Sequence, residues 1–258
     1  MTHTILVTGG TGTLGKRVVP LLRATGHRVR VLSRHHREPA DGVEYVTGDL
    51  VADEGIPAAV AGAEIIVHLA GGPKGDDIAA RNLVRAAADA GSVRHLVYIS
   101  VVGADRVPLG WFRTALAAEQ AVTGSGLPYT LLRAAQFHEI VFGMLGKMAK
   151  LPVIPNPGGL RFQPVDARDV AARLVELALG APAGRVPDLT GPTVYTMDKL
   201  IRGFLEEQGK RRPLLPIRIP GKAGRAYRAG ENLTLDGTQV GERSWESFLA
   251  DKESIATR

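Results

Sequence analysis

The sequence contains no cysteine among its 258 residues. Disulfide bonds, thiolate nucleophiles and cysteine-ligated metal sites are therefore excluded, and the absence fits a reducing compartment. Aromatic residues make up only 5% of the chain, and no apolar run reaches the roughly 20 residues that a membrane-spanning helix needs. The first residues already have the pattern of a strand, which leaves no room for a signal peptide. We therefore expect a cytoplasmic protein.

Acidic residues are missing from the segment 208–230, although the formal net charge of the whole chain is only +6. The basic residues of this segment are Lys210, Arg211, Arg212, Arg218, Lys222, Arg225 and Arg228. Nucleic-acid binding would fit the charge, but the single aromatic residue, Tyr227, offers bases no stacking platform. The apolar residues Leu214, Leu215, Ile217 and Ile219 instead indicate a packed extended stretch with a solvated basic edge. We expect a small-molecule substrate and neither a nucleic-acid nor a membrane partner, with the oligomeric state left open.

A glycine-rich turn near the N-terminus is the most informative pattern in the chain. The apolar run Ile5–Val7 leads into glycines at positions 9, 12 and 15, and an amphipathic helix pattern follows over Leu14–Thr25. A strand, a glycine turn and a helix N-terminus in this order bring backbone N–H groups against a pyrophosphate. The alternative is a tight turn that binds nothing. The predicted cofactor contacts of this turn are Gly9, Thr11, Gly12, Thr13, Leu14 and Gly15.

The end of the second predicted strand, Val29–Leu32, indicates which dinucleotide binds. An acidic residue at this position would hydrogen-bond the ribose hydroxyls and repel a 2′-phosphate. This strand is followed instead by Ser33 and Arg34. Arg34 can hold the phosphate through its planar guanidinium, and Ser33 can add a hydroxyl donor. The sequence therefore predicts NADP(H), with a solvated basic loop as the alternative.

The loops after the next two predicted strands supply further cofactor candidates. Asp49 and Leu50 follow the third strand, and Asp49 could accept a hydrogen bond from the adenine amino group or cap the next helix. Ala70, Gly71 and Gly72 follow the fourth strand, where small residues would let the cofactor ribose approach the backbone. An ordinary flexible loop explains the same three residues equally well.

Strand and helix patterns alternate through the first half of the chain. The predicted strands are Ile5–Val7, Val29–Leu32, Val43–Val46, Ile65–Leu69, Leu96–Ile99 and Tyr129–Leu132. The predicted helices are Leu14–Thr25, Ile56–Ala61, Ile78–Ala90, Thr114–Gly124, Ala134–Lys150, Val170–Leu179 and Met197–Gln208, with a proline-rich loop over Leu151–Gly159. This alternation predicts an α/β fold with a doubly wound, Rossmann-type parallel sheet and a central first strand. We treat residues 1–258 as a single NAD(P)-binding domain in which 134–164 and 185–258 form most of a small C-terminal substrate lobe.

Several motifs arrive in an order that resembles a known family. They are Thr8–Gly15, Gly48–Leu50, His68–Gly71, Val97–Ser100, Leu127–Arg133, Val165–Ala171 and Ser244–Leu249. Together they resemble the atypical short-chain dehydrogenases/reductases of the NmrA-like NAD(P)-binding group. The resemblance implies the doubly wound fold, a nicotinamide cofactor and, in many members, oxidoreductase activity.

The resemblance also implies a catalytic serine and a Tyr-x-x-x-Lys pair, and the pair is absent. Ser100 matches the serine position, where it would also lie against the cofactor, with a hydroxyl that only ends the fifth predicted strand as the alternative. Aligned on the shared Leu-Ala-Ala-Glu motif, Trp111 occupies the tyrosine position and Ala115 the lysine position. An indole N–H is not a usable acid, and alanine has no donor. The sequence therefore predicts that the standard proton relay does not operate.

Residues after the sixth predicted strand could replace that relay. His138 is the best-placed titratable group and could act as an acid or base near neutral pH, with a buried structural histidine as the alternative. We predict a substrate pocket lined by Trp111, Gln136, Phe137 and His138. No spacing of His, Asp or Glu residues predicts a metal site.

Taken together, the sequence predicts an NADP(H)-dependent oxidoreductase with a non-standard catalytic site. Its expected substrate is a small apolar or aromatic electrophile, such as a quinone, an iminium ion, a conjugated alkene or an activated carbonyl, because these need less help from a protein acid. Two alternatives remain. One is a regulatory protein that senses NADP(H) without catalysis, and the other is a non-redox isomerase, lyase or cyclase that uses the same pocket.

Overall fold

The computed structural model describes residues 2–72 and 74–256, which form two compact units. The first unit comprises Met1–Ser100, Gly110–Arg133 and Val170–Val186. The second comprises Val101–Leu109, Ala134–Asp169 and Pro187–Arg258. Most of the residues predicted for a C-terminal lobe thus belong to the second unit, and the binding of a substrate there stays a prediction.

The first unit is built on a parallel sheet. Its strands are β1 (Thr4–Thr8), β2 (Arg28–Ser33), β3 (Val43–Thr47), β4 (Ile65–His68), β5 (His95–Val101), β6 (Tyr129–Ala134) and β9 (Gly184–Arg185). They follow the order β6-β5-β4-β1-β2-β3, with β9 beside β6, and β1 pairs in parallel with both β2 and β4. The predicted doubly wound fold with a central first strand is therefore confirmed. The cofactor-binding edge of such a sheet is the carboxyl end of its strands, where the strand order reverses.

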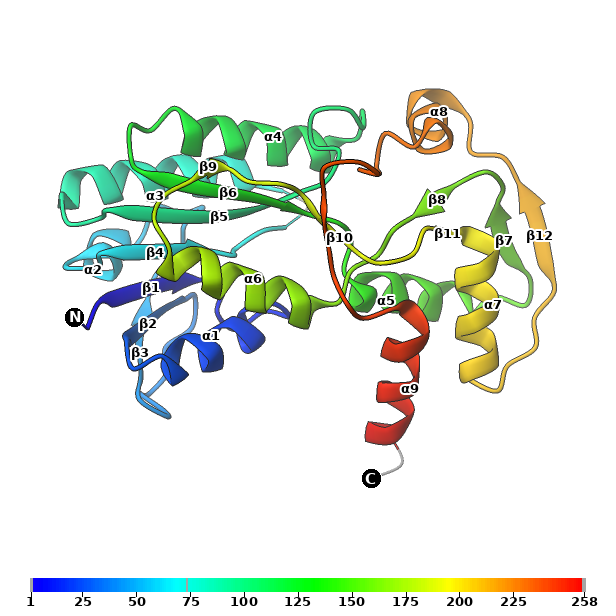
Figure 1. The fold of residues 1–258 in the computed structure, drawn as a ribbon, viewed down its shortest axis with the longest axis horizontal. Helices are drawn as coiled ribbons and strands as arrows, with labels where there is room; N and C mark the ends of the chain where they lie inside the picture. The colour runs from blue at the N-terminus through cyan, green and yellow to red at the C-terminus, as the bar shows by residue number, and fades with distance from the viewer. Residues whose placement is uncertain (1, 73, 257–258) are drawn as a thin grey trace. The chain divides into compact units, whose positions relative to one another are not determined.

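Helices cover both faces of this sheet. They are α1 (Gly15–Ala24), α2 (Ile56–Val60), α3 (Asp76–Ala90), α4 (Gly110–Thr123) and α6 (Ala167–Leu179). Figure 1 shows α3 and α4 over one face and α1 and α6 over the other. Leu6, Ile66 and Leu96 are fully buried in the apolar cluster formed with α2, α3 and α4. Their neighbours in the strands are buried as well, which is why the strands are continuous apolar runs.

The second unit contains short strand pairs and helices. Its elements are α5 (His138–Met148), β7 (Ile154–Pro157), β8 (Arg161–Phe162), β10 (Leu189–Thr190), β11 (Tyr195–Thr196), α7 (Met197–Glu207), β12 (Leu214–Ile217), α8 (Gly221–Ala229), β13 (Gln239–Val240) and α9 (Trp245–Ala256). The core packs Leu145 of α5, Phe204 of α7 and Trp245 of α9 together. Among the described residues, no helix combines the length and the apolar character needed to cross a bilayer.

Two predicted boundaries in the second unit are wrong. The helix predicted from Ala134 begins only at His138, because Phe137 is extended and forms a bridge with Val165. The loop predicted over residues 151–159 contains strand β7, which pairs in parallel with β12. In both places a partner distant in the sequence fixes an extended backbone that local patterns do not reveal.

A buried ion pair joins helix α4 to strand β6. Arg133 donates from Nε and Nη2 to the two carboxylate oxygens of Glu119, over 2.8 and 2.7 Å. The side chains are only 3% and 7% exposed. Removing one partner of such a pair leaves a buried charge without compensation.

We therefore expect Glu119→Ala to lower the free energy of unfolding by about 3–5 kcal/mol, measured by urea denaturation. The matched control is Arg85→Ala, which breaks the 2.6 Å pair with Asp53 on the surface of the same unit. That change should cost at most about 1 kcal/mol, because both of its side chains are well exposed. Similar losses for the two variants would contradict a structural role for the buried pair.

Candidate functional site

The turn between β1 and α1 depends on close backbone packing. Gly9 has a φ of +68°, and a Cβ atom there would lie 2.6 Å from the backbone nitrogen of Ala70. A Cβ atom on Gly15 would collide with the backbone of Gly9 and Gly10. The Gly12 N–H donates to the Gly9 carbonyl over 3.0 Å and closes the turn. Glycine at positions 9 and 15 thus brings strand, turn and helix together without side chains in between.

The N-terminus of α1 carries an uncompensated partial positive charge. No side chain caps this end of the helix, and its first turn contains no acidic residue. The aligned peptide dipoles favour an anion at such a position. The turn and the helix end together could therefore hold a phosphate group.

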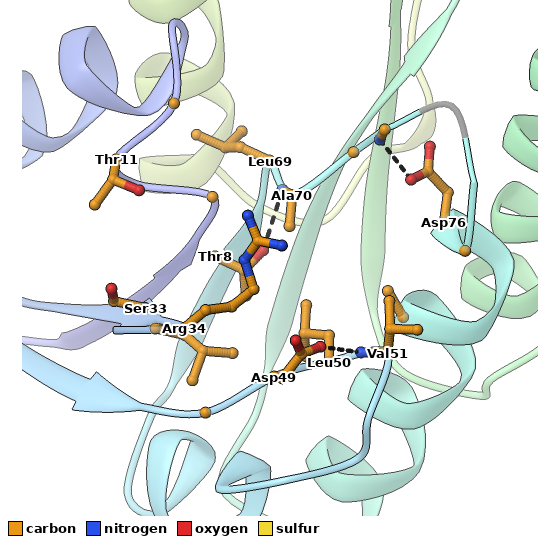
Figure 2. A pocket seen from close by; sticks show the side chains of 18 of the residues that line it. Thr8, Thr11, Ser33, Arg34, Asp49, Leu50, Val51, Leu69, Ala70 and Asp76 are labelled. Atoms are coloured by element: carbon orange, nitrogen blue, oxygen red, sulfur yellow. Dashed lines mark hydrogen bonds between the residues drawn. The ribbon is translucent and has the colours of Figure 1, made fainter. Parts of the chain in front are cut away.

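The end of β2 presents a basic side chain to the same region. Arg34 is exposed, and its guanidinium points into the pocket (Figure 2). Ser33 is buried, and its hydroxyl donates to the carbonyl of His35 over 2.8 Å. Ser33 thus shapes the turn that carries Arg34, and its hydroxyl proton is already used there.

Asp49 forms a local turn at the end of β3. Its Oδ1 accepts hydrogen bonds from the N–H groups of Val51 and Ala52, over 2.7 and 3.2 Å (Figure 2). The next helix, α2, starts after Gly55 and has no side-chain cap. The alternative in which Asp49 caps that helix is therefore wrong. The adenine contact stays a prediction.

The loop after β4 is tied to β1 by the hydroxyl of Thr8, which also contacts a buried histidine of β4. Thr8 Oγ1 accepts a hydrogen bond from the Ala70 N–H over 3.3 Å and lies 2.6 Å from Nδ1 of His68 (Figure 2). Burial lowers the pKa of His68 to about 4, so the ring is neutral at pH 7. A neutral imidazole can accept a hydrogen bond from the Thr8 hydroxyl while the Thr8 oxygen accepts one from the Ala70 N–H, and this second bond holds Ala70 beside the glycine turn.

The same loop is closed by a buried carboxylate at the start of α3. Asp76 Oδ1 accepts a hydrogen bond from the Gly72 N–H over 2.6 Å (Figure 2). Burial raises the pKa of Asp76 to about 6, although this hydrogen bond opposes the shift. Asp76 was not predicted from the sequence. In the sequence, the acidic pair at positions 76 and 77 is typical of a helix N-terminus, because carboxylates are favourable in the first turn of a helix.

These features line one pocket with a volume of about 680 Å³. The predicted cofactor residues that line it are Gly9, Thr11, Gly12, Ser33, Arg34, Asp49, Leu50, Ala70, Gly71 and Gly72. Those that do not line it are Thr13, Leu14, Gly15 and Ser100. Lining residues that the sequence analysis missed include Thr8, Lys74 and Asp76. The volume is ample for a nucleotide, and the role of each residue in cofactor binding stays a prediction.

The predicted catalytic positions of the first unit carry almost no acid–base chemistry. Ser100 lies near the carboxyl end of strand β5, and its buried Oγ has no hydrogen-bond partner among the described residues. Trp111 packs edge-to-face on Phe112 with ring centroids 5.3 Å apart. Ala115 is buried in helix α4. Of these groups, the Ser100 hydroxyl can donate or accept a hydrogen bond and the Trp111 indole N–H can only donate one, and neither group is an acid near neutral pH.

The predicted pocket residues of the second unit lie at the start of α5. His138 is fully buried, and its imidazole ring packs against the rings of Trp245 and Phe248. The ring centroids of these two residues lie 5.7 and 5.1 Å from that of His138. Its Nε2 lies 3.1 Å from the Pro164 carbonyl, to which it donates. This placement favours the structural interpretation of His138 over the catalytic one.

Gln136 differs from its neighbours because its side-chain amide has no partner. Both polar atoms lack a hydrogen bond within the described part of the chain, and the residue is only 9% exposed. Phe137 is extended and half-buried. No group of His, Asp or Glu residues among those described is arranged to hold a metal ion.

Comparison with known proteins places the chain in a family. The family described as NAD(P)H-binding matches residues 9–178. The NAD(P)H azoreductase of Xenophilus azovorans is 30% identical over 199 residues, which cover 73% of this chain and 68% of the azoreductase. The photosystem II assembly factor Ycf39 of Trieres chinensis is 30% identical over 166 residues. That match covers 59% of this chain but only 50% of Ycf39.

A solved structure has the same fold. The NADPH-dependent quinone oxidoreductase QOR2 of Escherichia coli, crystallised with NADPH, aligns with a TM-score of 0.81 at 20% identity. The alignment covers 96% of this chain and 99% of QOR2. The predicted resemblance to NAD(P)-binding reductases is thereby confirmed. The chain belongs to the NAD(P)H-binding family.

Proposed function

We propose that the chain is an NADPH-dependent oxidoreductase that reduces a small apolar or aromatic electrophile without a Tyr-x-x-x-Lys pair. The observation that carries this proposal is the pocket at the carboxyl edge of the first unit's sheet, with Arg34 on its wall. Relatives named as an azoreductase and a quinone oxidoreductase support the reaction type. When bound, the reduced nicotinamide would supply the hydride.

The pocket residues would hold the pyrophosphate and the 2′-phosphate of NADPH by different means. The backbone of the 9–15 turn and the N-terminus of α1 would hold the pyrophosphate. Arg34 has no ion-pair partner among the described residues, so its guanidinium is free to bind a 2′-phosphate. Asp76, which lines the same pocket, carries less negative charge near pH 6 than an ordinary aspartate would, and this lessens its repulsion of the phosphates.

The substrate class follows from the missing acid. No lysine lies between Lys74 and Lys147, and no tyrosine between Tyr98 and Tyr129. A positioned acid contributes roughly 10²–10⁴-fold to the reduction of a carbonyl. The Ser100 hydroxyl could donate a hydrogen bond to a substrate oxygen, but it cannot supply a proton near neutral pH as readily as a tyrosine paired with lysine. A quinone stabilises the negative charge that follows hydride addition and can take its proton from water.

Steady-state oxidation of NADPH tests the proposed reaction. We expect kcat/KM for p-benzoquinone to exceed that for cyclohexanone by at least about 100-fold, because only the ketone depends on a protein acid. The blank is the same quinone with NADPH and no protein. Equal kcat/KM values for the two substrates would contradict the proposal.

One alternative has a specific observation in its favour. Ycf39, which is similar to 59% of this chain, is named as an assembly factor. This similarity supports a regulatory role in which NADPH is bound but not oxidised. Tight NADPH binding with no oxidation by any quinone, iminium ion or conjugated alkene would favour this alternative. Conversion of a substrate without net loss of NADPH would instead favour an isomerase or lyase.

Cofactor choice is tested at Arg34. We expect Arg34→Ser to raise the Kd for NADPH by about 10- to 100-fold, the loss typical of a charge-assisted hydrogen bond, and to change the Kd for NADH within about threefold. Both constants can be measured by fluorescence titration. The matched control is Arg37→Ser, in the same basic loop but outside the pocket lining. Equal losses for NADPH and NADH would refute the phosphate assignment.

A further inference from the structure

The positive charge of the chain is concentrated in one part of the second unit. Residues 208–230 contain seven basic residues and no acidic residue. Since the formal net charge of the whole chain is +6, the rest of the chain sums to −1. The segment spans strand β12 and helix α8. A charge this uneven points to a local anionic partner rather than to general solubility.

Exposed apolar side chains lie in the middle of this charge. Leu214 of β12 packs on the core of the unit, but Leu215 and Ile217 point the other way and are 55% and 38% exposed. The sequence predicted a packed extended stretch with a solvated basic edge here. The extended conformation and the packing of Leu214 and Ile219 are confirmed, whereas Leu215 and Ile217 are exposed. Side chains alternate along a strand, so one face of β12 carries apolar side chains that no element among the described residues covers.

The neighbouring strand extends the same surface. β12 pairs with β7, and the Ile154 N–H donates to the Pro213 carbonyl over 2.9 Å at the beginning of the pair (Figure 1). Leu151 and Val153, just before β7, are 45% and 41% exposed. We call the following set the basic apolar ribbon: Lys150, Leu151, Val153, Lys210, Arg211, Arg212, Leu215, Ile217 and Arg218. All of its members are exposed.

The basic side chains of the ribbon have no acidic partners. None of them forms an ion pair within the described part of the chain. By contrast, many arginines elsewhere are paired, such as Arg81 with Asp77 and Arg202 with Asp198. The ribbon therefore presents uncompensated positive charge around apolar side chains.

The chemistry of the ribbon selects among possible partners. A second copy bound through the same surface would bring like charges together. A nucleic acid would use the charge but not the exposed leucine and isoleucine, and Tyr227 is already packed against Phe162, 5.7 Å between ring centroids. An anionic bilayer satisfies both features, because lipid phosphates pair with the basic groups while apolar side chains enter the acyl boundary.

We propose that the basic apolar ribbon binds the surface of a bilayer that contains anionic phospholipid. This inference revises the expectation of no membrane partner, which rested on the lack of an apolar span. It is independent of the proposed reductase activity. Each basic group near an anionic surface strengthens binding by about fivefold, so the cluster and the apolar residues together suffice for reversible attachment.

Vesicle flotation of the full chain tests the proposal. The probes are vesicles of phosphatidylcholine alone and vesicles in which about one third of the lipid is phosphatidylglycerol. We expect binding only to the second kind, and at least about a tenfold weaker partition constant in about 0.5 M NaCl, where charges are screened. Absence of binding to the anionic vesicles, or equal binding to both kinds, would overturn the proposal.

Two variants separate the electrostatic and apolar contributions. The triple variant Arg211→Gln/Arg212→Gln/Arg218→Gln should weaken binding on the order of 100-fold. The double variant Leu215→Ser/Ile217→Ser should weaken it by about tenfold at unchanged net charge. Because all five positions are exposed, the variants should keep the thermal midpoint of the wild type.

Matched controls carry the same chemical changes elsewhere on the surface. They are Arg23→Gln/Arg28→Gln/Lys199→Gln for charge and Leu179→Ser/Leu235→Ser for apolar area, all at exposed positions. Both controls should bind anionic vesicles within about twofold of the wild type. Equal losses in a control and its matched variant would overturn the assignment to the ribbon.

The other partners give distinct results in the same set of variants. Binding to a duplex oligonucleotide that needs the arginines but not Leu215 and Ile217, without vesicle binding, would replace the membrane with a nucleic acid. A dimer in light scattering that dissociates in Leu215→Ser/Ile217→Ser, again without vesicle binding, would replace it with a second copy. Vesicle binding that needs both kinds of residue supports the proposal.

Discussion

The contact between the glycine turn and the loop after β4 is the constraint on which the candidate site depends. Gly9 lies so close to Ala70 that a Cβ atom would come within 2.6 Å of its backbone nitrogen. Gly15 brings the start of α1 equally close to the same turn. Any side chain at these positions would separate β1, α1 and the β4 loop. The pocket exists because three backbone segments meet where no side chains intervene.

Hydrogen bonds hold the loop in this position. Thr8 connects Ala70 to the buried, neutral His68, and Asp76 closes the other end of the loop through Gly72. The unusual pKa of Asp76 follows from the same geometry, because the carboxylate gives up solvent to reach the backbone. The electrostatics of the pocket therefore combine a free arginine and a helix N-terminus with a carboxylate that ionises less easily than usual.

Much of the first unit could be predicted from the sequence for a physical reason. Its strands are buried on both faces, so each appears as an apolar run bounded by turn residues. The strand ends that converge at the carboxyl edge were predicted too, since their order follows from the alternation of strands and helices. Gly15 was expected to touch the cofactor, but it does not line the pocket; instead it permits the close approach of α1.

Other parts depend on contacts that no local pattern encodes. The role of Asp76 requires the loop from Ala70 to Gly72 to fold back over the start of α3. The late start of α5 depends on the bridge between Phe137 and Val165, and β7 exists only through its pairing with β12. The burial of His138 between Trp245 and Phe248 involves residues more than 100 positions away. Such long-range partners decide between structural and catalytic interpretations of the same residue.

A crystal structure of the chain soaked with NADP⁺ tests the central claim most directly. We expect the pyrophosphate to lie against the backbone of residues 9–15 and the 2′-phosphate to lie within hydrogen-bond distance of the Arg34 guanidinium. A dinucleotide bound outside this pocket, or one whose 2′-phosphate faces away from Arg34, would contradict that claim.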